Sequence, residues 1–146
     1  MIQLILHLIG DYLTQSNWMA QQKTKSHVAA ACHAIVYSLP FLLIASVPAF
    51  LVILVTHFFI DRYRLVRYVV YAKNFLSPPM TCEVRIAPSG HGTAKAHAWT
   101  KWWHDWEDCS STGYHNNMPA WLSVWLMIAA DNTLHLLINY LSIEFL

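Results

Sequence analysis

The sequence is poor in charged residues, which make up 12% of its 146 positions, against roughly 25% in an ordinary soluble domain. Nine Lys and Arg stand against eight Asp and Glu, so the net charge is close to zero and nothing indicates nucleic-acid binding. Three cysteines are too few for a disulfide framework. No basic segment precedes the first apolar run, so we expect no signal peptide.

Hydrophobic residues make up 56% of the chain and are gathered in long runs, which is typical of membrane spans. A helix needs about 20 residues to cross a bilayer. We therefore predict one domain of the all-α membrane class, a bundle of four transmembrane helices over about 2–21, 26–45, 48–74 and 118–143. The first helix is the weakest span, since its apolar part ends near Leu13. We expect Ser26 to cap the second helix, Pro40 to kink it, and Pro48 to start the third.

A polar insert, residues 76–118, separates the third and fourth predicted helices. Trp99, Trp102, Trp103 and Trp106 follow one another there at i, i+3, i+4 and i+7, which predicts a short amphipathic helix lying at the membrane interface. The alternative is a small soluble subdomain with a tryptophan core. All nine basic residues fall in the first predicted loop or between Arg62 and Lys101, so the positive-inside tendency predicts a cytoplasmic insert and both termini outside, in a bacterial inner membrane.

Histidine and aspartate recur four residues apart inside the apolar segments. The pairs are His7 with Asp11, His57 with Asp61, and Asp131 with His135, and His33 lies alone in a fourth such segment, which makes seven residues in all. Residues i and i+4 are neighbours on one helical face, and ionisable groups in membrane helices mark functional sites by default. Seven ligands exceed the needs of one metal ion but suit two ions that share a bridging carboxylate. The share of imidazoles favours zinc, with manganese or iron as alternatives, and Asp61 and Asp131 are candidates for a catalytic role.

Polar residues next to these positions extend the predicted site. Gln15 and Asn139 continue the same helical faces and Asn132 neighbours Asp131, so all three are candidates to orient the metal ligands. Arg62, Arg64 and Arg67 follow Asp61 and are candidates to bind a phosphate, although basic residues at the end of a span also fix topology. For the whole His/Asp set, the alternative to metal binding is a hydrogen-bonded or proton-carrying network that joins the helices.

Four segments carry a resemblance to a known family: HLIGDYLTQSNWMA, CHAIVYSLPF, THFFIDRYRL and PAWLSVWLMIAADNTLHLLINYL. They resemble a family of small phage and bacterial membrane proteins that is catalogued as a domain of unknown function, and more loosely the membrane-bound putative metal-dependent hydrolases. The resemblance implies roles for His7, Gly10, Asp11, Gln15, His33, His57, Asp61, Arg62, Asp131, Asn132, His135 and Asn139.

The expected function is a membrane-embedded, metal-dependent hydrolase of a phosphoester or lipid-like substrate. Membrane lipids would be its surroundings, and water would be the attacking nucleophile. The alternative is a non-catalytic, phage-encoded membrane protein that binds a host membrane component. In that case the His/Asp cluster would only hold the helices together.

Overall fold

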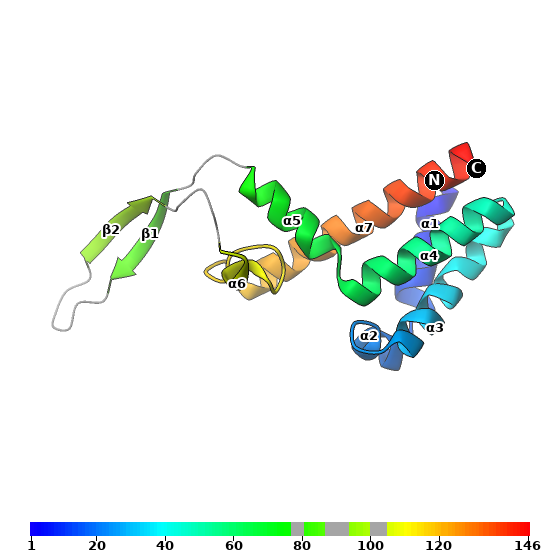
Figure 1. Cartoon of the computed structure of the whole chain (residues 1–146), viewed down its shortest axis with the longest axis horizontal. Coiled ribbons are helices and arrows are strands. Elements are labelled where there is room, and N and C mark those ends of the chain that lie inside the picture. The colour runs from blue at the N-terminus through cyan, green and yellow to red at the C-terminus, as the bar shows by residue number, and fades with distance from the viewer. Residues whose placement is uncertain (77–80, 87–93, 100–104) are drawn as a thin grey trace. The chain divides into compact units, whose positions relative to one another are not determined.

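The computed structural model describes residues 1–76 and 105–146 in full, and the backbone alone of residues 81–86 and 94–99 (Figure 1). The chain forms two compact units, Met1–Val66 with Trp125–Leu146, and Arg67–Val124, which are described separately. Outside one two-stranded hairpin, every regular element that the structure describes is helical. This confirms the predicted all-α class for the body of the chain.

The first unit begins with three short helical segments where the sequence predicts one helix over 2–21. The α-helix α1 (Ile2–Leu8) continues into a π-helix, η1 (Ile9–Leu13), and a separate helix α2 (Asn17–Gln22) follows. The break comes at Ser16, whose extended backbone and side-chain oxygen, which accepts from the Met19 amide at 3.3 Å, start α2 anew. The prediction of a continuous first helix is therefore wrong.

The second predicted helix is α3 (His27–Ser38) followed by a 3₁₀ turn, η2 (Leu39–Leu43). Ser26 caps α3 as expected, because its hydroxyl accepts a hydrogen bond from the Ala29 amide. Pro40 has no amide proton to donate and lies at the start of η2, so the α-helix ends there instead of bending and continuing.

The third predicted helix is divided at Arg64. The helix α4 (Val47–Tyr63) starts at the Ser46 cap with Pro48 in its first turn. It ends because Arg64 takes a left-handed conformation, with φ 50° and ψ 49°, which is unusual for a residue other than glycine. A new helix, α5 (Val66–Phe75), follows, so the prediction of one helix over 48–74 is wrong.

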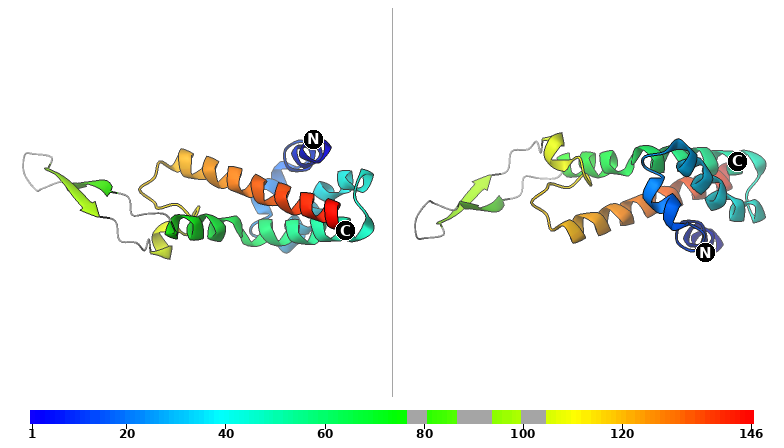
Figure 2. Two further views of the ribbon diagram at one scale, coloured as in Figure 1. Left: turned by 90° about the horizontal axis from the view of Figure 1, so that it is seen from above. Right: turned by 90° about the horizontal axis from the view of Figure 1, so that it is seen from below.

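The helix α7 (Ala120–Phe145) agrees with the fourth predicted helix to within two residues at each end. Its Trp125–Leu146 part belongs to the first unit, where it runs alongside α4 (Figure 2). Among the described residues, α7 is the helix that is long and apolar enough to cross a membrane, by length and composition only. The structure thus has one helix of spanning length where the sequence predicts four.

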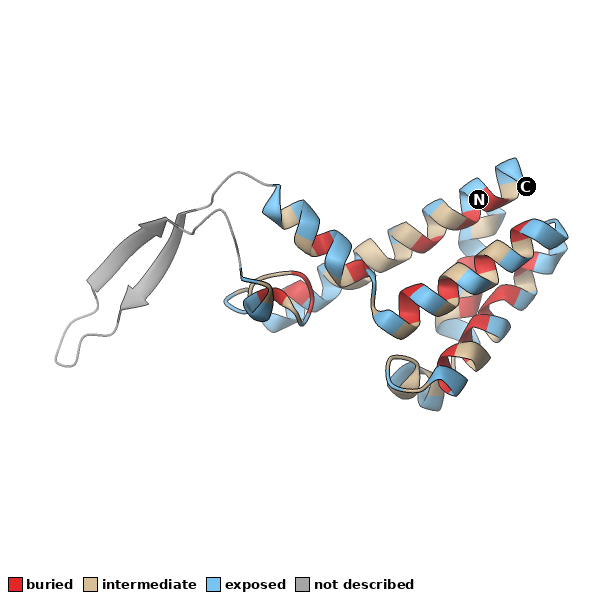
Figure 3. Ribbon diagram, viewed as in Figure 1, coloured by how far each residue is buried: buried red, intermediate tan, exposed pale blue. Residues whose placement is uncertain are grey.

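The interior of the first unit combines polar and apolar side chains, and its surface is rich in apolar ones. His7, His33, His57 and His135 are at most 2% exposed, whereas Leu39, Leu51 and Leu137 are each more than half exposed. The buried residues form stripes along the facing sides of α3 and α4, which pack against each other (Figure 3). Tyr37, Phe41 and Ile53 are buried as well, so this unit differs from an ordinary soluble domain in its four buried histidines and in the many large apolar side chains on its surface.

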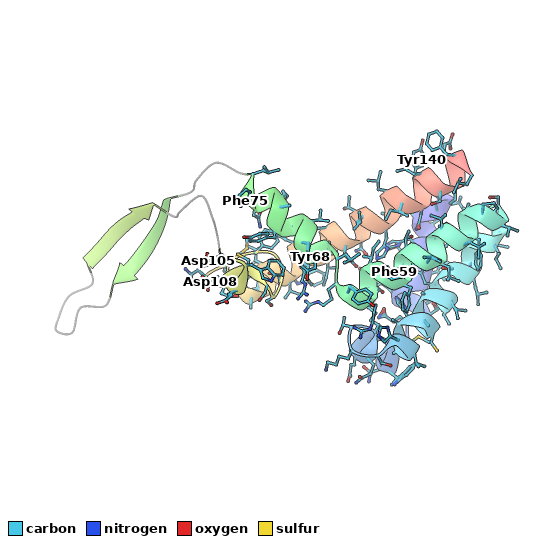
Figure 4. All side chains as sticks on the ribbon, viewed as in Figure 1. Phe59, Tyr68, Phe75, Asp105, Asp108 and Tyr140 are labelled. Carbon is cyan, nitrogen blue, oxygen red and sulfur yellow. The ribbon has the colours of Figure 1, made fainter. Side chains whose placement is uncertain are left out.

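The second unit contains α5, an antiparallel hairpin of β1 (Thr81–Ile86) and β2 (Ala94–Trp99), and the short helix α6 (Trp106–Cys109). Thr81 pairs with Trp99, so the predicted tryptophan helix is wrong at Trp99, which lies in a strand. Trp102 and Trp103 lie outside the described residues. Trp106 stacks on Tyr68, one of the residues labelled in Figure 4, with the ring centroids 4.8 Å apart.

Candidate metal centre

Small residues bring the helices of the first unit close enough for their polar side chains to meet. Ala29, Ala30 and Ala34 on α3 and Ala49 on α4 are completely buried. Side chains of this size let helix backbones approach one another closely. Gly10 on η1 serves the same end, because a Cβ added there would lie 2.6 Å from the ring of Tyr37 on α3. The polar residues of these helices therefore face a shared interior.

Four ligand-type side chains from three helical segments form the first group: Asp11, His33, His57 and Asp61. His33 Nε2 lies 3.0 Å from His57 Nε2, 3.1 Å from Asp61 Oδ2 and 3.2 Å from Asp11 Oδ1. His57 Nε2 lies 3.2 Å from Asp61 Oδ2 and 3.6 Å from Asp11 Oδ1. Bonds of about 2.0–2.1 Å to one metal ion put its ligand atoms roughly 2.9–3.4 Å apart, so the group matches the edges of a coordination polyhedron.

The second group joins Asp61 to two residues of α7, Asp131 and His135. His135 Nε2 lies 3.6 Å from Asp61 Oδ1 and 3.7 Å from Asp131 Oδ2. Asp61 therefore turns Oδ2 toward the first group and Oδ1 toward the second. This is the arrangement in which one carboxylate can bridge two metal ions.

Several of the inward-facing atoms have no described partner in hydrogen-bond geometry, although ionisable groups lie close to them. They include Asp11 Oδ1, Asp61 Oδ2 and His135 Nε2, and all are buried. Buried polar atoms in native proteins nearly always have a partner, and an ion bound between them is one way to supply it. The donor set of imidazole nitrogens and carboxylate oxygens suits zinc, manganese or iron. The residues therefore fit a metal ion in each group.

Lys23, which the sequence predicts only as a loop residue, contacts the first ligand group. Its Nζ lies 2.8 Å from Asp61 Oδ2, 3.3 Å from His33 Nε2 and 3.2 Å from Gln15 Oε1. Burial by itself lowers the pKa of Lys23, but the carboxylates of Asp61, Asp11 and Asp131 raise it by more, so its pKa lies above the usual value. Lys23 is thus a fixed positive charge beside the first group, and Gln15 contacts it rather than a metal ligand.

His7 lies beside the two groups, and both of its ring nitrogens have other partners. Nδ1 is 2.8 Å from the Tyr37 hydroxyl and Nε2 is 3.1 Å from Asn132 Oδ1. Asn139 Nδ2 donates to the same Tyr37 hydroxyl at 2.7 Å. Of the predicted orienting amides, Asn132 thus contacts His7 and Asn139 reaches it through Tyr37. The structure places His7 in this network, 3.5 Å from Asp11 Oδ2, and outside both ligand groups.

The three arginines predicted as a phosphate-binding cluster each have different surroundings. Arg62 donates to the Thr24 carbonyl at 2.7 Å. Arg67 belongs to the second unit, where it donates to the Ser110 carbonyl. Arg64 lines a pocket together with Asp61 and Asp131.

The comparison with known families decides the identity of the N-terminal half of the chain. A family described as "Protein of unknown function (DUF3307)" matches residues 1–77. The chain belongs to this family. The matched part contains Asp11, Lys23 and Asp61, whereas Asp131 and the rest of α7 lie beyond it. No curated protein and no solved structure matches the chain.

Proposed function

We propose that this DUF3307 protein is a membrane-embedded hydrolase that uses divalent metal ions to cleave a phosphoester or lipid-like substrate. The observation that carries the proposal is the division of the Asp61 oxygens between two ligand groups. Zinc is the favoured metal, with manganese or iron as alternatives. Paired ions bound there would stabilise the attacking and the leaving oxygen of a displacement at phosphorus.

Asp61 and Asp131 have different roles in this proposal because their surroundings differ. The Asp61 side chain is only 4% exposed and faces His33, His57 and His135, so it would serve as a ligand in both groups. The Asp131 side chain is 27% exposed and lines the pocket. Asp131 can therefore accept the proton that an attacking water molecule loses. Lys23 and Arg64 offer positive charge to an anionic substrate on the same side.

The apolar surface of the first unit supports a location in the membrane. Phe59 on α4 and Tyr140 on α7, both labelled in Figure 4, are 46% and 50% exposed. Large exposed apolar surfaces mark sites that contact a membrane or a partner. We therefore propose that the helices of this unit, and not α7 alone, are embedded in the inner membrane of a bacterium. The short helices α1 and α3 would lie there together with η1 and η2, which extend them.

The proposal is tested by the metal content and activity of the full chain purified in a mild non-ionic detergent. We expect about one to two transition-metal ions per chain, and hydrolysis of p-nitrophenyl phosphate that a chelator removes and zinc restores. Metal-free protein that is well folded would refute the proposal. It would favour the alternative, in which Lys23 alone neutralises Asp61 and the cluster only joins the helices of a non-catalytic, phage-encoded membrane protein.

The orientation has its own test. The distribution of basic residues favours a cytoplasmic insert, residues 76–118, with both termini outside. In intact cells, a single cysteine placed at exposed Asp105, on a background without the three native cysteines, should not react with an impermeant thiol reagent. Labelling of this residue before cell lysis would reverse the orientation.

A further inference from the structure

A partly open pocket of about 180 Å³ lies against the second ligand group, within the first unit. Its polar lining consists of residues from the segment after α2, from the end of α4 and from α7, namely Lys23, Thr24, Asp61, Arg64 and Asp131. The volume corresponds to about six water molecules, which is enough for a small polar group and the first atoms attached to it. The pocket is therefore the place where a substrate can reach the candidate metal centre.

The charges of the pocket indicate an anionic ligand. The positive charges of Lys23 and Arg64 cancel the negative charges of Asp61 and Asp131. A divalent ion held by Asp61, Asp131 and His135 would therefore leave the pocket with a net charge of about +2, since bound cations dominate the local field. A phosphate monoester, which carries up to two negative charges, matches this balance.

Arg64 is held at the pocket by its backbone and by α7. Its left-handed conformation ends α4 beside Asp61, and Arg64 Nη2 donates to Met127 Sδ at 3.7 Å. Non-glycine residues in this conformation are strained, and such strain is found preferentially at functional sites. A guanidinium group can donate two parallel hydrogen bonds to a phosphate, which lysine cannot do. Arg64 therefore has the chemistry and the position of a phosphate ligand.

The rest of the pocket wall is apolar. Ile60 and Val66 on one side and Met127 and Ile128 on α7 complete the lining. These side chains cannot hydrogen-bond a sugar or a peptide, but they suit an alkyl chain. The wall lies on a unit whose outer surface is also apolar, so a chain leaving the pocket would meet lipid in the proposed setting.

We infer that this pocket binds the phosphate of a lipid phosphate monoester, with Arg64 as the residue that determines specificity for the phosphate. The inference rests on the proposed function and names its substrate class. In the reaction, a water oxygen bonds to phosphorus as the phosphorus–oxygen bond to the alkyl chain breaks. Asp131 takes a proton from the water, the leaving alkoxide takes one from solvent, and Asp131 afterwards returns its own proton to solvent. The products are an alcohol and inorganic phosphate, with no change of oxidation state.

The experiment measures binding by calorimetry to zinc-loaded full-length protein in a non-ionic detergent, with dodecyl phosphate and inorganic phosphate as the probes. Wild-type protein should bind dodecyl phosphate at least about tenfold more tightly than inorganic phosphate, because the chain adds buried apolar area. Arg64→Gln should weaken both interactions about tenfold or more. The matched control is Lys25→Gln, which removes a positive charge from an exposed position and should change neither affinity.

Zinc content is measured on every sample, so that the two proposals fail in different ways. Unchanged affinity of zinc-loaded Arg64→Gln would overturn the assignment of Arg64 and leave the metal-dependent hydrolase intact. Equal binding of the two probes by wild-type protein would overturn the lipid substrate. If Arg64→Gln does not fold, Arg64→Gly replaces it, since glycine adopts the left-handed conformation without strain and should show the same loss. Wild-type protein that folds but does not hold zinc would refute the proposed function itself.

Discussion

Asp61→Asn should remove most of the metal from both ligand groups and lower hydrolysis by about a thousandfold or more. Each Asp61 oxygen faces a different group, so the one substitution takes a negative charge from both. Asparagine nearly keeps the volume and one acceptor oxygen, so we expect the helices to pack as before. Elemental analysis of the purified variant measures the first effect, and hydrolysis of p-nitrophenyl phosphate at equal protein concentration measures the second.

The matched control for this variant is Asp105→Asn in the second unit. Asp105 precedes the first residue of α6, is exposed and makes no capping hydrogen bond with its side chain. The same chemical change there should leave the metal content and the activity unaltered. Circular dichroism and size-exclusion chromatography in detergent show whether each variant is folded. Full metal content in well-folded Asp61→Asn would contradict the bridging role and the two-ion site together.

Asp131→Asn should affect metal binding in the second group and not in the first, because Asp131 belongs to the second group alone. We expect the variant to lose about one ion per chain, to keep the ion held by Asp11, His33 and His57 with Asp61, and to lose hydrolysis by about a hundredfold or more. Metal titration of the metal-free protein, followed by calorimetry, should show one tight site where wild-type protein shows two.

The comparison for Asp131→Asn is the adjacent Asn132→Ala, which removes a partner of His7 and no ligand of either group. That variant should keep both ions. If Asp131→Asn bound metal and hydrolysed substrate as wild-type protein does, Asp131 would have neither the ligand role nor the role of proton acceptor.

Part of the candidate site could be predicted from the sequence because it depends on local geometry. His57 with Asp61, and Asp131 with His135, lie four residues apart on intact stretches of α4 and α7, so helical periodicity alone puts each pair on one face. That the groups share Asp61 could not be predicted, because it depends on how α4 and α7 pack. The contacts of Lys23 could not be predicted for the same reason, since its partners Asp61 and His33 lie on other segments of the chain.

The helix boundaries show where sequence patterns are insufficient. Ser26 has a side-chain oxygen that can cap a helix, and Pro40 has no amide hydrogen to donate. The cap at the start of α3 and an interruption of the helix near Pro40 could therefore be expected from the residue types. Arg64 ends α4 in a conformation that favours glycine or asparagine, so its residue type argued for a continuous helix. Tyr37 did carry a signal that was missed, because a hydroxyl four residues after His33 lies on the same face of α3.

The π-helix Ile9–Leu13 sets the register of the N-terminal segment. Relative to an α-helix, a π turn accommodates one additional residue, and such turns are frequent at functional sites. If the same residues wound as a regular α-helix, the additional residue would rotate the residues on one side of the turn by about 100° relative to those on the other. Either Asp11 would then leave His33 or His7 would leave Tyr37. The segment can therefore tolerate many exchanges of its exposed apolar residues, as long as the π turn itself is kept.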